Sequence, residues 1–145
     1  MDELEEKMKV VLADTFAMYL KTHMFHWNVT GPNFSELHAF FGGIYAELWA
    51  AVDLIAEQIR TLDAYAPGSF TRYLQLATVQ DETSIPAAMS MVSKLKDDND
   101  KVMESLKAAY LKAEELKVYG LANFLQDRID IHAKHGWMLK ATMKV

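Results

Sequence analysis

Residues 85–116 read IPAAMSMVSKLKDDNDKVMESLKAAYLKAEEL, and the spacing of their apolar members decides the fold. These members recur at steps of three and four, with Asn99 as the one interruption: Ile85, Ala88, Val92, Leu95, Val102, Leu106, Ala109, Ala113 and Leu116. A sustained period of about 3.5 residues places them on one face of an α-helix that packs along its length against other helices. A helix of ~30 residues is about 45 Å long, so it needs partners of similar length.

A second stretch, residues 34–64, repeats the spacing with Phe34, Leu37, Phe41, Ile44, Leu48, Ala51, Ile55, Gln58 and Leu62. Glycine and proline gather in the short stretches between such segments, which marks turns. The pattern predicts helices over 3–29, 34–64, 85–117 and 120–143, with a short helical turn near 70–76. Two helix starts are also predicted: a capping box of Asn33 with Glu36, and Ser84 followed by Pro86 in the first turn.

These segments predict an all-α, four-helix bundle. The stretch from Asp63 to Ser84 is long enough to run the length of the bundle. A connection of that length makes the second and third long helices parallel, as in bundles with one long crossover, here carrying the short helix. With 145 residues, the chain forms one domain, 1–145.

Composition narrows the function classes. Cysteine is absent, which excludes disulfide scaffolds, thiolate catalysis and iron–sulfur clusters. The formal net charge of -5 counts against general nucleic-acid binding. The first residues are acidic rather than basic and then apolar, and no apolar run approaches the ~20 residues of a membrane span. We therefore expect a cytoplasmic protein without a membrane partner.

The helix over 34–64 has a second face of small residues, opposite its apolar seam: Ala39, Gly42, Gly43, Ala46, Ala50 and Ala56, with Trp49 among them. Small residues at helical spacing allow another backbone to approach closely, so this face predicts an interface. The simplest partner is a second copy related by a two-fold axis. The alternative is a surface run of alanines favoured only for helix propensity.

Two carboxylates, Asp53 and Glu57, lie on this small-residue face at positions i and i+4 and so point the same way. Unpaired charges in an interface are unfavourable, which favours a cation between them. The alternative is an ordinary surface pair neutralised by Arg60.

Two histidines, His26 and His38, flank the tight turn at Gly31–Asn33, which brings the ends of successive helices together. Alone, each is more often a hydrogen-bonded core residue than a ligand. Two imidazoles with two carboxylates form a mixed nitrogen and oxygen site that suits Fe(II), Mn(II) or Zn(II). Asp53 lies more than ~20 Å along the helix from His38, so one chain cannot unite all four ligands, whereas an antiparallel second copy could.

The stretch THMFHWNVTGPNF (22–34), with Leu37-His38 and Phe41, and then DLIAEQIR (53–60), closely resembles the motif of Dps-type miniferritins. The resemblance covers nearly the whole chain and returns at Asp127-Arg128-Ile129 and at HAKHGWML (132–139). It implies a ferritin-like bundle in a hollow homo-dodecamer that oxidises Fe(II), preferentially with hydrogen peroxide, and stores Fe(III) inside. It also implies a ferroxidase site with Zn or Mn as other possible occupants, shared across a two-fold axis: His26 and His38 from one subunit, Asp53 and Glu57 from its neighbour.

The chain departs from that family pattern at three places. Gly42 stands where a carboxylate ligand is expected, and Asn123 where an acidic residue of the iron-conducting pore is expected. There is no lysine-rich N-terminal tail, so DNA binding is not expected. The alternative function is therefore a metal-binding or structural cage with ferroxidase activity weakened at Gly42. His23, His132 and His135 are assigned surface or structural roles.

Overall fold

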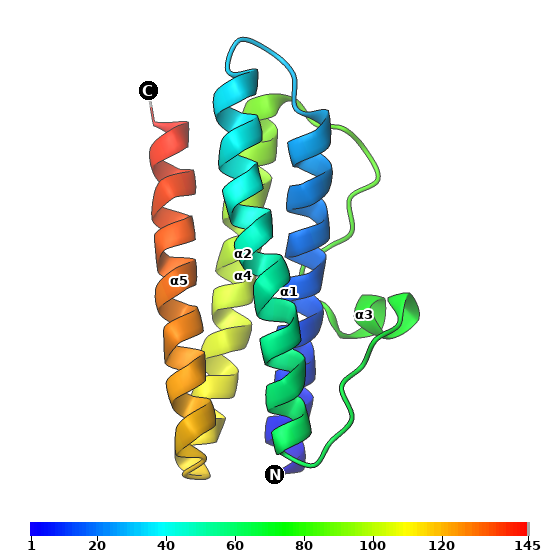
Figure 1. The fold of residues 1–145 in the computed structure, drawn as a ribbon, viewed down its shortest axis with the longest axis vertical. Helices are drawn as coiled ribbons and strands as arrows, with labels where there is room; N and C mark the ends of the chain where they lie inside the picture. Colours follow the sequence, from blue (N-terminus) through cyan, green and yellow to red (C-terminus); the bar gives the residue numbers. More distant parts are fainter. Residues whose placement is uncertain (145) are drawn as a thin grey trace.

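The computed structural model describes residues 1–144, which form five helices and no strand. Val145, the last residue of the expected domain, lies outside the described residues. The four long helices form a bundle, and a short fifth helix lies on the connection outside it (Figure 1): α1 (Asp2–Asn28), α2 (Phe34–Thr61), α3 (Phe70–Leu76), α4 (Ala88–Glu115) and α5 (Tyr119–Met143). The all-α, ferritin-like bundle predicted from the sequence is confirmed, as is the short helix over 70–76.

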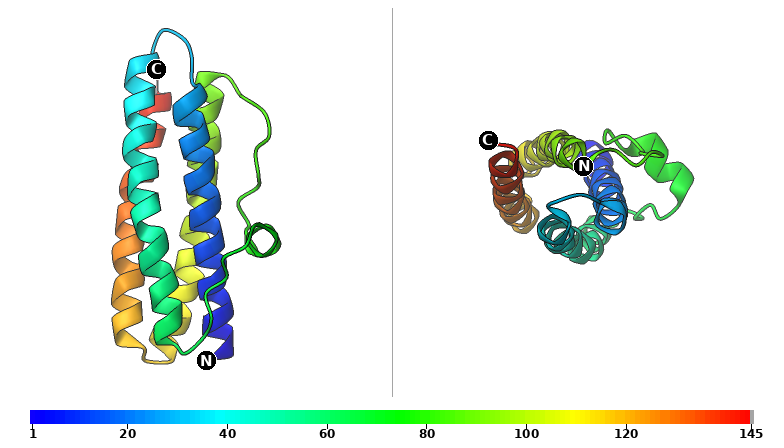
Figure 2. Two further views of the ribbon diagram at one scale, coloured as in Figure 1. Left: turned by 45° about the vertical axis from the view of Figure 1, so that its right-hand side comes forward. Right: turned by 90° about the horizontal axis from the view of Figure 1, so that it is seen from above.

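The connection between α2 and α4 runs from one end of the bundle to the other along the outer side of α1 (Figure 2). Since α4 begins at the end of the bundle where α2 also began, the two helices are parallel, as expected from the length of residues 63–84. The end-on view places α3 outside the ring of long helices, beside α1. The crossover therefore leaves the exposed faces of α2 and α5 uncovered.

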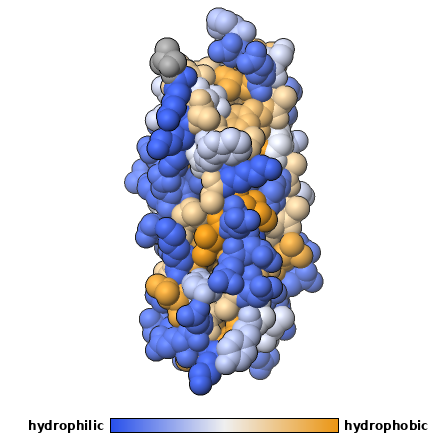
Figure 3. Space-filling view, turned by 90° about the vertical axis from the view of Figure 1, so that its left-hand side faces the viewer, coloured by the Kyte–Doolittle hydropathy of each residue, from blue (hydrophilic) through white to orange (hydrophobic). Residues whose placement is uncertain are grey.

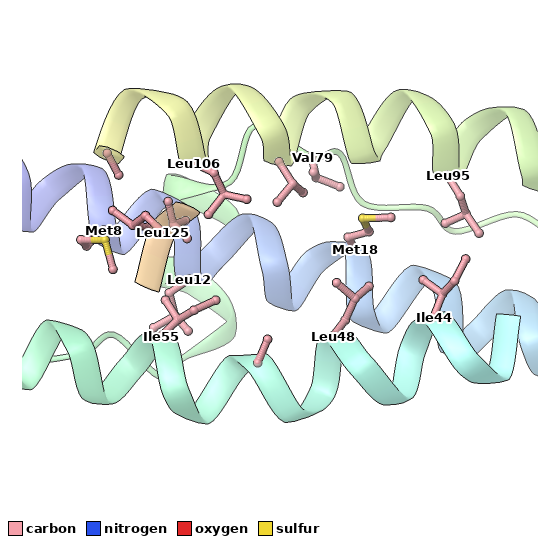
Figure 4. Packing of buried hydrophobic residues seen from close by; sticks show 14 of the residues in the cluster. Met8, Leu12, Met18, Ile44, Leu48, Ile55, Val79, Leu95, Leu106 and Leu125 are labelled. Atoms are coloured by element: carbon pink, nitrogen blue, oxygen red, sulfur yellow. The ribbon is translucent and has the colours of Figure 1, made fainter. Parts of the chain in front are cut away.

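The predicted apolar seams form the core. Side chains from α1, α2, α4 and the crossover point into the space between the helices (Figure 4). The seam of α2 is buried from Leu37 to Ile55 and then passes to Ile59 rather than Gln58, because 3.6 residues per turn do not keep a 3.5 repeat in register over many turns. Phe34 and Ile85, at the predicted ends of two seams, are exposed.

Helix α2 begins at Phe34 as predicted, but neither of the two predicted helix caps forms. Asn33 precedes α2, but its side chain makes no capping hydrogen bond, and its backbone (φ -103°, ψ 23°) lies outside the extended region that a capping residue usually adopts. Helix α4 begins at Ala88, three residues later than expected. The Ser84 hydroxyl donates to Glu82 at 2.7 Å instead of capping a helix, and the residue before Pro86 is biased toward extended backbone.

A buried carboxylate on α1 fastens the crossover to the bundle. Asp14 accepts hydrogen bonds from the backbone N–H of Thr78 (2.6 Å) and of Val79 (3.0 Å), and from the hydroxyls of Thr78 and Ser105. Val79 in turn packs in the hydrophobic core. The carboxylate thus ties the crossover, α1 and α4 together at one point.

Helix α2 is long and apolar enough to cross a membrane when judged by length and composition alone, which a search for uninterrupted apolar runs did not reveal. The apolar composition of α2 follows from the way its two sides pack. One side of α2 supplies core residues such as Phe41 and Leu48, and the opposite side carries mostly alanine and glycine, with Asp53 and Glu57 as its charged residues.

A groove of about 840 Å³ separates α2 from α5. Figure 3, which views the α5 side of the molecule, shows hydrophobic residues running down the middle of this side between hydrophilic ones. Apolar side chains from both helices line the groove, among them Phe40, Ile44 and Met138. Polar side chains rather than close helix packing connect α2 to α5 at this place.

Candidate metal centre

The two predicted histidine ligands hold each other in place. Nδ1 of His26 donates to the backbone carbonyl of His38 at 2.6 Å, and Nδ1 of His38 donates to the carbonyl of His26 at 2.7 Å. A carbonyl oxygen only accepts, so both rings carry their proton on Nδ1 and a free lone pair on Nε2. The tight turn after α1 makes this reciprocal contact possible. Both rings are therefore prepared, in tautomer and orientation, to bind through Nε2.

The two rings also stack, with centroids 3.8 Å apart and planes 17° apart. Two imidazoles on one ion place their ring centroids about 5 Å apart or more, since metal–nitrogen bonds are ~2.0–2.1 Å long. His26 and His38 are too close and too nearly parallel to bind the same ion. Their lone pairs instead suit two neighbouring metal positions.

Gly42 lies against the His26 ring. A Cβ built at residue 42 would lie 3.3 Å from Cε1 and 3.4 Å from Nδ1 of His26, which is tighter than ordinary van der Waals contact. The glycine at this position therefore does two things: it omits the carboxylate expected from the resemblance, and it leaves room for the imidazole.

A third histidine lies beside this pair, within an aromatic cluster. The ring of His23 stacks on Tyr45 (centroids 3.7 Å, planes 9° apart), its Nδ1 is 2.9 Å from the Tyr19 hydroxyl, and Trp27 lies 4.1 Å away. Burial, and then the nearby His26, lower the pKa of His23. The sequence predicts only a surface or structural role for this residue. Its spacing of three residues from His26 was the signal that it shares the same side of α1.

Asp53 and Glu57 are exposed on α2, in its C-terminal half, ~22 Å and ~28 Å along the helix from His38. Among residues 1–144, no three His, Cys, Asp or Glu side chains gather closely enough to hold a metal ion. The chain thus brings His26 and His38 together and leaves the two carboxylates apart from them.

Arg60, the alternative partner of these carboxylates, is engaged elsewhere. Its guanidinium donates to the Ala64 carbonyl at 2.9 Å and lies 4.9 Å from the Tyr65 ring centroid. Within the described part of the chain no ion pair joins Arg60 to Asp53 or Glu57. The small-residue face around the carboxylates is largely exposed, with the Trp49 side chain 57% exposed.

The remaining histidines are buried, which corrects their expected surface placement and supports the structural role. His132 donates from Nδ1 to the Asn99 side-chain oxygen at 2.7 Å and accepts at Nε2 from Arg128. His135 and Arg128 both donate to Glu47 on α2. Asn99, the one break in the apolar seam of α4, is therefore the α4 member of a hydrogen-bond network that joins α4, α5 and α2.

The network strongly shifts the pKa values of two of its groups, His132 and Glu47. Burial, with the Arg128 charge adding to it, lowers the pKa of His132 to about 3, so the ring stays neutral. Burial alone raises the pKa of Glu47, but hydrogen bonds from His135 and Arg128 outweigh it and lower the value to about 2. Sequence reasoning did not single out Glu47, because its partners lie more than 80 residues away along the chain.

Comparison with known proteins agrees with the fold. A sequence profile described as a ferritin-like domain matches residues 5–145. A low temperature-induced protein of Nostoc sp. is 35% identical over 90% of this chain and 74% of its own length. A DNA protection during starvation protein of Brevibacillus brevis is 33% identical over 92% of this chain and 89% of its own length.

Among solved structures, the Dps protein of Vibrio cholerae, described as a member of the ferritin-like diiron-carboxylate superfamily, has a TM-score of 0.94 and 31% identity. The match covers 99% of this chain and 90% of that one. Sequence profile, relatives and fold therefore agree over nearly the whole chain. The chain belongs to the ferritin-like family, as a Dps-type miniferritin.

Proposed function

We propose that this protein is an iron-oxidising and iron-storing miniferritin whose ferroxidase site forms between two subunits. His26 and His38 of one subunit and the partner subunit's Asp53 and Glu57 bind the Fe(II) substrate. The observation that carries the proposal is the reciprocal contact of His26 and His38, which leaves two prepared Nε2 lone pairs side by side.

The ligand types fit the oxidation. Imidazole binds Fe(II) well, and carboxylates favour Fe(III) because their negative charge offsets the higher charge of the metal. Each Fe(II) gives one electron, so two metal positions together supply the two electrons that cleave the O–O bond of hydrogen peroxide. Two protons complete the reaction, which yields two Fe(III) and two waters.

Assembly supplies the second half of the site. The exposed small-residue face of α2 carries both carboxylates, and a two-fold axis through that face would bring them to the histidines of a second copy. We propose a homo-dodecamer of 16.5-kDa chains with the ferric product stored inside. The location is the cytoplasm, where a reducing environment supplies Fe(II). DNA and membranes are not proposed as partners.

A second candidate function rests on Gly42. The Cβ space at this residue faces the His26 ring, and no carboxylate extends from residue 42 toward the second metal position. The protein would then be a metal-binding or structural cage with weak ferroxidase activity, in which the same ligands could bind Zn(II) or Mn(II).

Anaerobic addition of Fe(II) to the assembled protein, followed by hydrogen peroxide, separates the two functions. The ferric absorbance should rise rapidly in the parent and slowly in Glu57→Gln, which keeps the shape and removes the charge. Glu104→Gln, at an exposed position of α4, is the matched control and should behave as the parent. A parent as slow as Glu57→Gln would exclude the ferroxidase and leave the cage.

A further inference from the structure

We propose that His23 is a third imidazole ligand, which binds together with His26 to one metal ion. The inference rests on the proposed function for the carboxylates that complete the site. It assigns a second imidazole to the first metal position, that of His26, whereas the carboxylate missing at residue 42 belongs to the second position, next to His38.

The spacing of the rings carries the argument. His23 and His26 have ring centroids 6.0 Å apart and planes 56° apart. Two imidazoles on one ion have centroids about 5–6.5 Å apart, given metal–nitrogen bonds of ~2.0–2.1 Å. His23 and His26 meet this condition, whereas the stacked pair His26 and His38, at 3.8 Å, does not. The pair able to chelate one ion is therefore on α1 alone.

The orientation of His23 agrees with its spacing. Nδ1 faces the hydroxyl of Tyr19, one turn earlier on α1, so the opposite edge of the ring, which holds Nε2, faces the turn that contains His26. A tyrosine hydroxyl both donates and accepts. Tyr19 can therefore accept a hydrogen bond from Nδ1–H, which leaves the lone pair of His23 on Nε2, as in the other two rings.

Tyr45 fixes the plane of the same ring. It stacks on His23 with planes 9° apart and stands on α2, one turn after Gly42. Tyr19 and Tyr45 are thus positioning residues for His23, and they come from the two helices that also carry His26 and His38. Imidazole is a neutral ligand that suits Co(II) and Zn(II), while Mn(II) prefers oxygen ligands. A second imidazole at this position should therefore favour the former ions.

The test is calorimetric titration of the assembled protein with Co(II) and with Mn(II), together with the visible absorption of bound Co(II). His23→Phe keeps an aromatic ring against Tyr45 and removes both nitrogens. It should weaken Co(II) binding at least tenfold, weaken Mn(II) binding less, and change the Co(II) spectrum. Tyr119→Phe, at an exposed position of α5, is the control and should match the parent.

The outcomes separate this inference from the proposed function. If His23→Phe binds Co(II) with the parent's affinity and spectrum while Glu57→Gln binds it weakly, His23 is no ligand and the shared site stands. A parent that binds no Co(II) overturns both. Should His23→Phe fail to assemble, His23→Leu replaces it, because a leucine side chain has no lone pair to offer a metal.

Discussion

Glu47 on α2 accepts a hydrogen bond from Nε2 of His135 on α5 at 2.8 Å, across the groove that separates the two helices. Arg128, about two turns earlier on the same side of α5, pairs with the same carboxylate. Few other contacts hold α2 to α5. The spacing of α2 and α5 therefore depends on a group of charges, while packing against α1 holds α2 in the bundle.

The first prediction concerns pH. The pKa of Glu47 is about 2 in the folded chain, below its ordinary value of 4.5. The pKa of His132 is about 3, below its ordinary value of 6.5. In both cases the unfolded state binds the proton first as pH falls, so acid favours unfolding. His132 lowers stability as pH drops from 6.5 toward 3, and Glu47 does so from 4.5 toward 2.

Thermal unfolding followed by circular dichroism from pH 7 to pH 3 tests this linkage. The midpoint should fall continuously below pH 6.5, and Glu47→Gln should show a smaller decrease below pH 4.5 than the parent. Equal slopes in the two proteins below pH 4.5 would mean that Glu47 is not the group responsible.

The second prediction concerns Gly136, where α5 lies close against α4. A Cβ there would lie 2.9 Å from Nδ2 of Asn99, which donates to the His132 carbonyl. Gly136→Ala should lower the free energy of unfolding by ~1–3 kcal/mol, as overpacking does. Urea unfolding measures the effect. Gly120→Ala, with open space around its Cβ, is the control and should remain within about 1 kcal/mol of the parent; a loss of equal size in both variants would count against the steric explanation.

Much of the fold was predictable because it depends on local periodicity. The apolar residues of α2 and α4 recur at steps of three and four, and a short turn precedes α2 and follows α4. His26 and His38 were also predictable as neighbours, since a short turn forces the end of one helix against the start of the next. Their reciprocal hydrogen bonds were not, because they depend on ring orientation.

The rest depends on partners far away in the sequence. Asn99 interrupts a seam visibly, but nothing local shows that His132 is what it binds. Asp14 lies among apolar residues of α1, and its partners stand 64 to 91 positions later. Ser84 has the chemistry of a helix cap, yet a carboxylate two residues away competes for its hydroxyl.

Asp14 gives the third prediction. Its buried carboxylate accepts from Thr78, Val79 and Ser105, and buried donors without partners cost about 1–3 kcal/mol each. Asp14→Ala should therefore lower the free energy of unfolding by ~2–4 kcal/mol and speed amide exchange at residues 78 and 79. Thr78→Val removes one donor only and should have the smaller effect. Unchanged exchange at these amides in Asp14→Ala would show that the crossover is held by other contacts.

Assembly gives the fourth prediction. Ala46 and Ala50 lie exposed on the small-residue face of α2, where the proposed two-fold interface has room for no long side chain. Ala46→Lys should shift the protein from the dodecamer to smaller species in light scattering, without loss of helix content. Leu111→Lys, at an exposed position of α4, should assemble as the parent does. A parent that is a stable monomer would contradict the interface and the shared site together.

The last prediction concerns the residue that distinguishes this chain from its family pattern. Gly42→Asp should add a carboxylate at the second metal position, next to His38, and raise the amount of Fe(II) bound per subunit in anaerobic calorimetry. The new Cβ would press on His26 at 3.3 Å, so the first position should bind more weakly than in the parent. Gly42→Ala separates the two effects, because it introduces the Cβ without the carboxylate and should weaken the first position while adding no metal. Both variants gain up to ~1 kcal/mol of helix propensity, so unfolding must be measured beside binding. If Gly42→Asp assembles normally and binds no more Fe(II) than Gly42→Ala, residue 42 is not a missing ligand, and the glycine serves only to accommodate His26.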